Sequence, residues 1–295
     1  MAKPLVSKPE ANACMNTESR RLIVSADDFG LSEAVNEGIE IAHRDGLLST
    51  ASLMVAGDAA ADAMARARRL PDLRVGLHLV AIEGQATNGA SAITDPSGWI
   101  GSDQLGLGIR YFFTRSGRAA LAREVQAQYR AFARSGLTLD HANAHKHMHL
   151  HPTVGRMLIE TGAEYGLPAI RIPCEPPAPL GPDHKDTAGA AILRLWTRVL
   201  RAQAHRARLR TNDHCFGLAW SGHMTSDRLL PLAANLPPGL SELYFHPAAR
   251  RDAVIDRLMP DYDHVGELAA LTNPQLRSAL DHAGVQQVTW DGSHI

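Results

Sequence analysis

Arg21-Leu22-Ile23-Val24-Ser25-Ala26-Asp27-Asp28-Phe29-Gly30 is the stretch of sequence that decides the fold. A short apolar, β-branched run ends abruptly in two aspartates, which is typical of a buried strand followed by a polar turn. Ser32 then opens a helical pattern that closes near Gly46, since serine suits a helix N-cap and glycine a helix end. The order strand, acidic turn, helix therefore places Asp27 and Asp28 at the C-terminal end of a strand.

The same alternation of strands and helices continues along the rest of the chain. About eight strands alternating with helices favour one parallel α/β domain, a distorted TIM-like (β/α) barrel, over an open sheet. No glycine-rich fingerprint follows the first strand, which counts against a dinucleotide-binding fold. Further strands are predicted at residues 48–55, 74–80, 137–144, 168–173, 214–218, 241–246 and 285–290, and further helices at 58–70, 118–134, 152–165, 190–210, 226–235 and 273–283.

Chain organisation follows from the same patterns. Residues 1–20 have no apolar run of the kind a secretory signal needs, and we expect a flexible tail there, with residues 21–295 forming the barrel domain. The segments 81–108 and 174–186 are rich in Gly, Ser, Thr, Asn or Pro. Loops of this length in a compact domain are usually functional, so we expect them to form the substrate loops.

Composition excludes several classes of protein. Lys and Arg (30) nearly balance Asp and Glu (31) in the 295 residues, so no overall charge favours nucleic acid as a partner. The three cysteines lack metal-site spacing and are too few for a disulfide scaffold, which favours a reducing, cytoplasmic location. No apolar run is long enough to span a bilayer. The sequence gives no indication of the oligomeric state.

A histidine run follows the strand predicted at 137–144. Five of the fifteen histidines lie in eleven residues, and His145, His147 and His149 alternate as side chains do on one face of an extended segment. Imidazole is the commonest metal ligand in proteins. A bare metal-affinity tract or a solvated loop is the alternative interpretation.

Distant residues supply partners for this run. Asp27 and Asp28, His78, His145 and His246 all lie at or near the ends of predicted strands. In a parallel barrel these ends meet on one rim, where one carboxylate and two imidazoles would leave a metal with open coordination positions. Adjacent aspartates are expected to point in opposite directions from a strand, so that one binds the cation and the other remains free as a base. Taken singly, the aspartate pair could be a helix cap and His78 a core residue.

Four motifs occur in one order along the chain: the stretch from Val24 to Ser32, Gly76-Leu77-His78-Leu79, the run His145-x-His147-x-His149-x-x-Pro152, and Glu242-Leu243-Tyr244-Phe245-His246-Pro247. Together they resemble the successive motifs of the YdjC/ChbG carbohydrate deacetylases. Asn143-Ala144-His145-Lys146-His147 and the Arg-rich segment at 190–210 look most like the hopanoid biosynthesis-associated branch of that family, HpnK.

The resemblance implies a metal-dependent N-deacetylase, a hydrolase of linear amides. Family ligands map to Asp28, His78 and His145, which would hold one divalent metal. Asp27 would be the general base on the attacking water, and His246 would protonate the departing amine. Zinc is the expected metal, while Mg, Mn, Fe, Co and Ni are alternatives, because geometry and availability decide more than the set of ligands.

Two further positions follow from the resemblance. Arg171 matches a family position near the pocket and is expected to bind substrate or to orient Asp27. Many relatives have Asp where this chain has Asn143, and we expect Asn143 to accept a hydrogen bond from the imidazole of His145, as a weaker, neutral acceptor.

The substrate implied by the hopanoid branch is N-acetylglucosaminyl bacteriohopanetetrol, which would become the glucosaminyl form. Soluble N-acetylated oligosaccharides such as diacetylchitobiose are the alternative substrates. A metal-dependent phosphoesterase and a non-catalytic metal-binding protein are more distant alternatives.

The helix predicted at 190–210 is amphipathic and basic. Its apolar arc comprises Ile192, Leu193, Leu195, Trp196, Val199 and Leu200, opposite an arc of Arg194, Arg198, Arg201, His205 and Arg208. Packing on the barrel explains this pattern, and a peripheral contact with the inner face of the membrane is the alternative.

Overall fold

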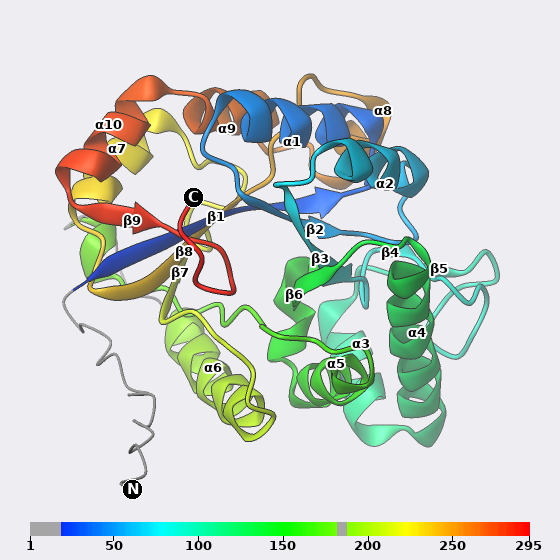
Figure 1. Cartoon of the computed structure of the whole chain (residues 1–295). Coiled ribbons are helices and arrows are strands. Elements are labelled where there is room, and N and C mark those ends of the chain that lie inside the picture. Colours follow the sequence, from blue (N-terminus) through cyan, green and yellow to red (C-terminus); the bar gives the residue numbers. More distant parts are fainter. Residues whose placement is uncertain (1–18, 182–187) are drawn as a thin grey trace, which may run out of the picture.

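The protein, a computed structural model that describes residues 19–181 and 188–295, is a parallel sheet covered by helices on both faces (Figure 1). The first strand carries the deciding stretch, and residues 22–29 are all buried. A strand with both faces covered reads as a continuous apolar run rather than an alternating one, which explains its sequence. The strands of the main sheet are β1 (Arg20–Phe29), β2 (Thr50–Leu53), β3 (Arg74–Leu79), β6 (Leu139–Ala144), β7 (His214–Phe216), β8 (Gly239–Phe245) and β9 (Val285–Gln287).

The sheet follows the order β6-β3-β2-β1-β8-β7, with β9 beside the N-terminal half of β1, and its strand pairs are parallel. This half-barrel with surrounding helices confirms the predicted α/β, TIM-like fold. The predicted strand at 168–173 is wrong as a regular strand, because it makes only the isolated bridges Ala142–Ile170 and Ala169–Arg210. The side chain of Asn212 bonds both the N–H and the C=O of Ile172 and so replaces a neighbouring strand there.

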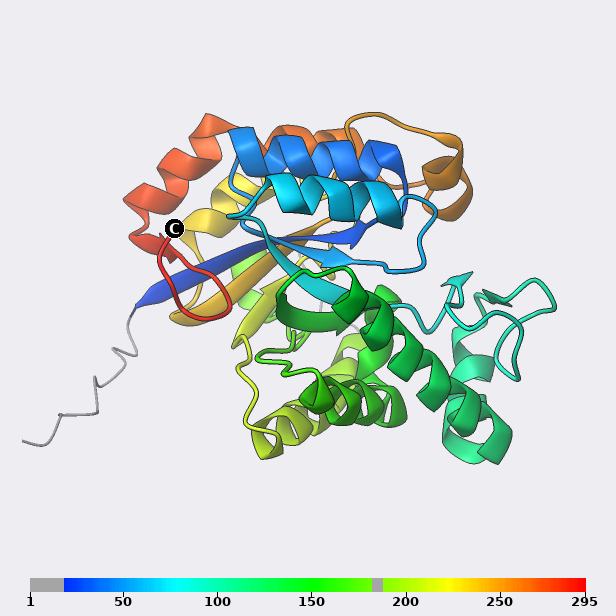
Figure 2. The same cartoon turned by 45° about the vertical axis from the view of Figure 1, so that its right-hand side comes forward.

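Two groups of helices enclose the sheet, as Figures 1 and 2 show. The capping serine of the first helix behaves as expected, since the Ser32 side chain accepts a hydrogen bond from the Val35 N–H. One face carries α1 (Glu33–Asp45), α2 (Ala60–Arg69), α7 (Ser226–Ala234), α8 (Ala253–Leu258), α9 (His264–Leu271) and α10 (Pro274–His282), and the other carries α3 (Gln104–Phe113), α4 (Arg115–Arg134), α5 (Pro152–Glu164) and α6 (Ala188–Arg206).

Several predictions about the connecting segments need correction. The loop predicted at 81–108 contains the short antiparallel pair β4 (Gly84–Gln85) and β5 (Trp99–Ile100), and α3 already begins at its end. The helices α8 and α9 were not predicted, because they are only six and eight residues long. The 3₁₀ helix η2 (Ala178–Leu180) lies in the second predicted loop, whose residues 182–186 lie outside the described residues, as does almost all of the predicted tail.

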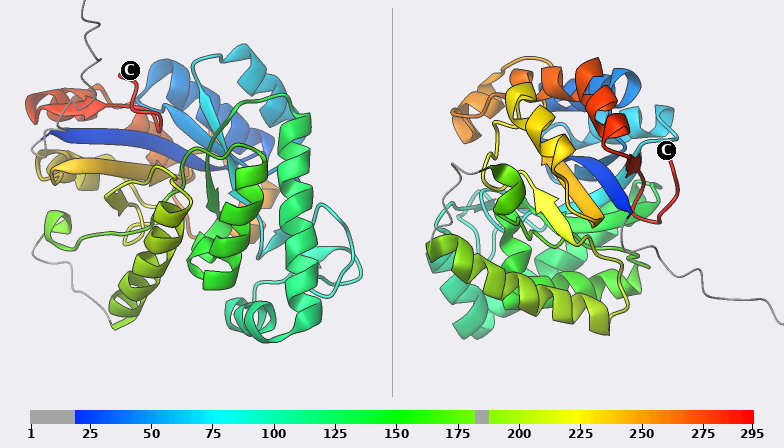
Figure 3. Two further views of the ribbon diagram at one scale, coloured as in Figure 1. Left: turned by 60° about the horizontal axis from the view of Figure 1, so that its bottom comes forward. Right: turned by 90° about the vertical axis from the view of Figure 1, so that its left-hand side faces the viewer.

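Helix α6 runs beneath the sheet on the face opposite α1, as both views in Figure 3 show. The apolar residues predicted to share one face of α6 differ in their exposure. Leu200 is buried against the core, but Leu195 and Trp196 are 57% and 38% exposed. The side chain of Ile192 lies outside the described side chains. Within the described residues, no helix combines the length and the apolar character needed to cross a bilayer.

Candidate active site

The two aspartates lie in an irregular end of β1. The pairing of β1 with β2 shifts register between Ala26 and Phe29, and Asp28 adopts a left-handed backbone conformation with φ of 62°. Asp27 Oδ1 lies 3.8 Å from His78 Nδ1, and Asp28 Oδ1 lies 3.2 Å from His78 Nε2. The expectation that adjacent aspartates point apart is therefore wrong, because the strand is irregular here and both carboxylates lie near the same histidine.

The histidine run is not an extended segment. It forms the 3₁₀ helix η1 (His145–Leu150), and both Lys146 and His147 have positive φ, 50° and 53°. Non-glycine residues rarely adopt this conformation, and it is common at functional sites. The predicted common face for the alternating histidines is therefore wrong. Only His145 reaches the aspartates, with its Nδ1 3.0 Å from Asp28 Oδ1.

Asp28, His78 and His145 form a cluster suited to a metal ion. Their ligand atoms lie within 4.8 Å of one another, and all three residues are buried. Asp28 Oδ2 and His78 Nε2 are buried without a hydrogen-bond partner in the described part of the chain, an arrangement that is costly unless a cation or water satisfies them. Burial alone would raise the pKa of Asp28, but His145 and His78 hold that pKa well below its usual range, so the carboxylate is ionised.

Asp27 is held by a buried arginine. Arg171 donates through one terminal nitrogen to Asp27 Oδ2 at 2.5 Å, and through its other terminal nitrogen to Glu242 Oε1 at 2.8 Å. Burial would raise the pKa of Asp27, but the charges of Arg171 and His78 lower it well below the usual range. Arg171 has no exposed surface, so the geometry favours its orienting role over direct contact with substrate.

Asn143 forms a hydrogen bond with His78 and not with His145, contrary to our expectation. Its Oδ1 lies 2.7 Å from His78 Nδ1, and its Nδ2 donates to Asp27 Oδ1 at 2.9 Å. The reason is geometric: Asn143 pairs with His78 in the register of β6 on β3, whereas His145 lies beyond the strand end. The amide thus connects the metal cluster to Asp27.

His246 follows β8 and lies beside two aromatic rings. Its ring centroid is 5.6 Å from that of Tyr244 and 5.1 Å from that of Tyr262. Its Nδ1 is buried without a hydrogen-bond partner in the described part of the chain. Burial lowers the pKa of His246 to about 4, against the raising effect of the two aspartates. The ring is therefore neutral near pH 7.

The sequence assigned no role to two residues that support the site, Glu242 and Tyr244, although both belong to the fourth motif. Tyr244 stacks under the Arg171 guanidinium, 4.6 Å from ring centroid to Cζ, and its hydroxyl lies 3.0 Å from His147 Nε2. Glu242 fixes the other side of the same guanidinium. The Nε2 atom of His149 lies 3.1 Å from the carbonyl oxygen of Arg171. A glutamate and a tyrosine in the otherwise apolar strand β8 were the available signal.

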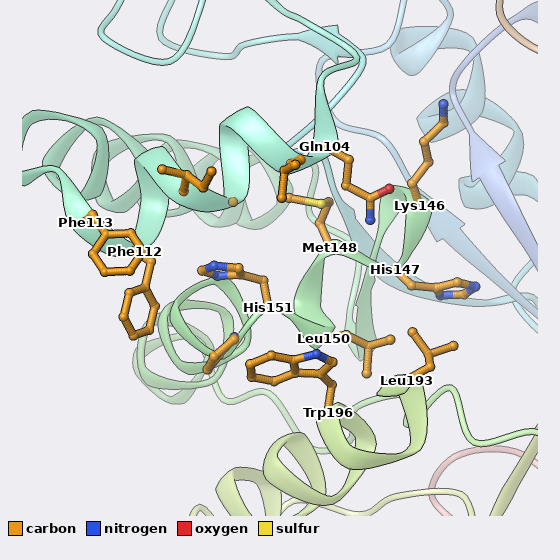
Figure 4. A pocket seen from close by; sticks show the side chains of 14 residues that line it. Gln104, Phe112, Phe113, Lys146, His147, Met148, Leu150, His151, Leu193 and Trp196 are labelled. Atoms are coloured by element: carbon orange, nitrogen blue, oxygen red, sulfur yellow. The ribbon is translucent and has the colours of Figure 1, made fainter. Parts of the chain in front are cut away.

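An apolar groove of about 780 Å³ begins beside the site, at His147, and runs outward between α3 and α6 (Figure 4). The labelled side chains of Phe112 and Phe113 approach it from α3, and Trp196 and Leu193 approach it from α6. Of the eight exposed large apolar side chains in the described part of the chain, five line this groove: Leu105, Ile109, Phe112, Phe113 and Trp196.

Comparisons with known proteins show which chains this one is similar to. A model of the YdjC-like protein family matches residues 21–282. Carbohydrate deacetylases of Geobacillus stearothermophilus and Brevibacillus brevis are 30% and 29% identical to this chain over 92% of its length, and the alignments cover 97% and 98% of those proteins. A carbohydrate deacetylase of Vibrio cholerae is 37% identical over 150 residues, which span 50% of this chain and 57% of that protein. The crystal structure of a putative cellobiose-phosphate cleavage protein from Enterococcus faecalis has the same fold, with a TM-score of 0.72 and 20% identity over 94% of this chain and 100% of that one.

Proposed function

This chain belongs to the YdjC-like family, and from that membership we propose that it is a metal-dependent carbohydrate N-deacetylase. The observation that carries the proposal is the position of Asp27, an ionised carboxylate fixed by Arg171 beside the cluster of Asp28, His78 and His145. A base next to a three-ligand metal site is an arrangement suited to hydrolysis of an amide.

The cluster fits a divalent cation, with zinc the expected one. Two imidazoles and one carboxylate provide three ligands, and a catalytic zinc site leaves a further position open. A bound cation would polarise the amide carbonyl and make water more acidic. His78 offers Nε2 to this position because its Nδ1 faces Asn143 Oδ1, and Asp28 offers its unpartnered Oδ2.

The chain's own residues provide the proton transfers. Asp27 accepts the proton of the attacking water, since its depressed pKa keeps it ionised and Arg171 and Asn143 fix its direction. His246 delivers a proton to the departing amine. Because burial lowers the pKa of His246 to about 4, the ring is neutral at first and must gain this proton during the reaction. In the net balance it is the proton that Asp27 removes from the attacking water. The products are acetate and a free amino sugar.

A mass-spectrometric screen of N-acetylated amino sugars, free and lipid-linked, with the zinc-loaded protein tests this proposal. We expect loss of one acetyl group from at least one of them, and no loss after treatment with a chelator. Hydrolysis of phosphate esters without any deacetylation would favour the phosphoesterase alternative. Metal binding without either reaction would favour a non-catalytic metal-binding protein.

The apolar groove favours a lipid-linked substrate over a soluble oligosaccharide such as diacetylchitobiose. Ligand pockets of this volume are lined mainly by apolar side chains when they bury an apolar ligand. A free sugar would leave Phe112, Phe113 and Trp196 in water. N-acetylglucosaminyl bacteriohopanetetrol, whose sugar is attached to a large apolar body, has the required chemistry and is the substrate we propose.

We also propose that the protein contacts the membrane surface through α6. Leu195 and Trp196 are exposed on α6, next to Arg198, whose charge suits anionic headgroups. Flotation with anionic liposomes should separate the wild type from a Leu195→Glu, Trp196→Glu variant. Equal, weak binding by both proteins would contradict the contact without affecting the deacetylase proposal.

A further inference from the structure

A chain of buried polar groups runs away from the proposed site into the sheet. His141, Ser52 and Asn143 have no exposed surface, and Asp140 is 9% exposed. Asn143 Nδ2 lies 3.0 Å from Ser52 Oγ, Ser52 Oγ lies 3.0 Å from His141 Nε2, and His141 Nδ1 lies 3.1 Å from Asp140 Oδ2. Buried polar groups are costly unless each is satisfied, so this continuous chain calls for an explanation.

The direction of every hydrogen bond in this chain follows from its two carboxylates. Asn143 must turn Nδ2 toward the Asp27 carboxylate, because a carboxylate can only accept. Its Oδ1 therefore faces His78, so His78 carries its proton on Nδ1 and keeps the lone pair of Nε2 for the metal cluster.

The other end is fixed in the same way. Asp140 accepts from His141 Nδ1, which leaves His141 Nε2 as an acceptor. The single hydroxyl proton of Ser52 therefore goes to His141, and Ser52 Oγ accepts the second proton of the Asn143 amide. Reversing any one group would place two donors or two acceptors face to face.

The His141 ring is held between neighbours that leave it little freedom. Trp290 stacks on it with ring centroids 5.4 Å apart and planes 21° apart. A Cβ atom at Gly76 would lie 2.4 Å from the Cε1 and Nδ1 atoms of the same ring. The absence of a side chain at Gly76 therefore makes room for the imidazole.

We propose that Ser52 and His141 are positioning residues for the deacetylase reaction. Together with Asp27, they fix the rotation of the Asn143 amide, and through it the tautomer of the metal ligand His78. This inference rests on the proposed function, but its tests do not all require activity. A neutral asparagine lies at the centre of this chain, and Ser52 and His141 oppose its reversed rotation from the side away from Asp27 and His78.

The test compares Ser52→Ala with Ser49→Ala. Both serines are buried in or next to β2, but in the described part of the chain the Ser49 hydroxyl bonds only the Val24 carbonyl oxygen. Competition with a chromophoric chelator gives the zinc affinity. We expect about tenfold weaker binding for Ser52→Ala, as for other residues that orient metal ligands, and wild-type binding for Ser49→Ala. With the proposed substrate, kcat should fall in Ser52→Ala while KM changes little.

Histidine ¹⁵N spectra of the metal-free protein provide a second readout, one that a merely structural role would not change. They are recorded well above pH 7, because Asp27 and Asp28 raise the pKa of His78 despite its burial and only a neutral ring shows a tautomer. The His78 signals, identified by their loss in His78→Gln, should show a single Nδ1–H tautomer in the wild type and a mixture in Ser52→Ala. His141→Phe, which keeps the ring stacked on Trp290, should shift the signals in the same direction if Ser52→Ala does not fold. Wild-type zinc affinity and an unchanged tautomer in the variant that folds would overturn the inference, whether or not the wild type proves to be a deacetylase.

Discussion

Arg171 and Asp27 lie 144 residues apart in the sequence and are joined by a 2.5 Å hydrogen bond between fully enclosed side chains. The same guanidinium also binds Glu242 and lies over Tyr244. One guanidinium thus pairs with two buried acidic side chains, one of which is the proposed general base.

Removing this cation should destabilise the protein strongly. Arg171→Met leaves Asp27 and Glu242 buried without their cationic partner, and breaking a buried ion pair costs about 3–5 kcal/mol. Urea unfolding of the metal-free protein measures the change, and a second substitution, Glu242→Gln, should recover part of the loss. A cost below about 1 kcal/mol would show that Arg171 does not hold these carboxylates.

Metal binding should depend on Asp28 and His145 and not on His147. The reason is that His147 bonds Tyr244 and lies outside the three-ligand cluster. At a zinc concentration about 100 times the Kd, binding should add about 2.7 kcal/mol to the free energy of unfolding of the wild type and of His147→Ala. Asp28→Asn and His145→Ala should lose most of this gain. Loss in His147→Ala with retention in His145→Ala would mean that another histidine of the run is the ligand.

Acid should destabilise the protein partly through His149. Burial and the nearby Arg171 lower the pKa of His149 from 6.5 to about 3. Between these two pH values the His149 side chain is therefore protonated in the unfolded chain and neutral in the folded chain. This contribution to stability is fully present above pH 6.5 and is lost as the pH falls toward 3. His149→Gln keeps a donor toward the Arg171 carbonyl without titrating. Urea unfolding at pH 7, 6 and 5 gives the free energy of unfolding as a function of pH. Its slope should be smaller in His149→Gln than in the wild type, by up to about 1.4 kcal/mol per pH unit, and equal slopes in the two proteins would contradict the prediction.

Substitutions in the groove should change substrate preference without changing the chemistry. Phe112→Ser and Trp196→Ser each remove one apolar contact, and burial of such a side chain is worth about 1.5–3 kcal/mol. We expect kcat/KM for the lipid-linked sugar to fall about tenfold or more in each variant, while kcat/KM for a free N-acetyl sugar stays unchanged. Val265→Ser, on α9, is the matched control, because it is a similarly exposed apolar residue outside the groove. Equal losses on both substrates would argue against a lipid-binding groove.

The sequence predicted the elements that depend on local pattern. The capped start of α1 at Ser32 and the buried run of β1 were readable because both follow from the nearest neighbours in the chain. It also predicted that Asp28, His78 and His145 would meet, because parallel strands end on one rim. The roles of Asp27, His246 and Arg171 in catalysis stay predictions.

What the sequence could not predict depends on contacts between distant residues. The irregularity at Asp27 and Asp28 lies in the pairing of β1 with β2, and the left-handed turn at Lys146 replaced an expected extended segment. The exposure of Trp196 depends on where α6 lies relative to α3, which helical periodicity does not specify. The preference of Asn143 for His78 over His145 follows from strand register.

The most direct test of the central claim is acetate release by Asp27→Asn loaded with zinc. Asp27 is the proposed base but not a ligand, so the variant should bind one zinc with nearly wild-type affinity. Its rate of acetate release from the N-acetylated sugar should be about 10²- to 10⁴-fold lower than that of the wild type. Full activity with bound zinc would contradict the proposed role of Asp27, and loss of the zinc would contradict the separation of base and metal ligands at this site.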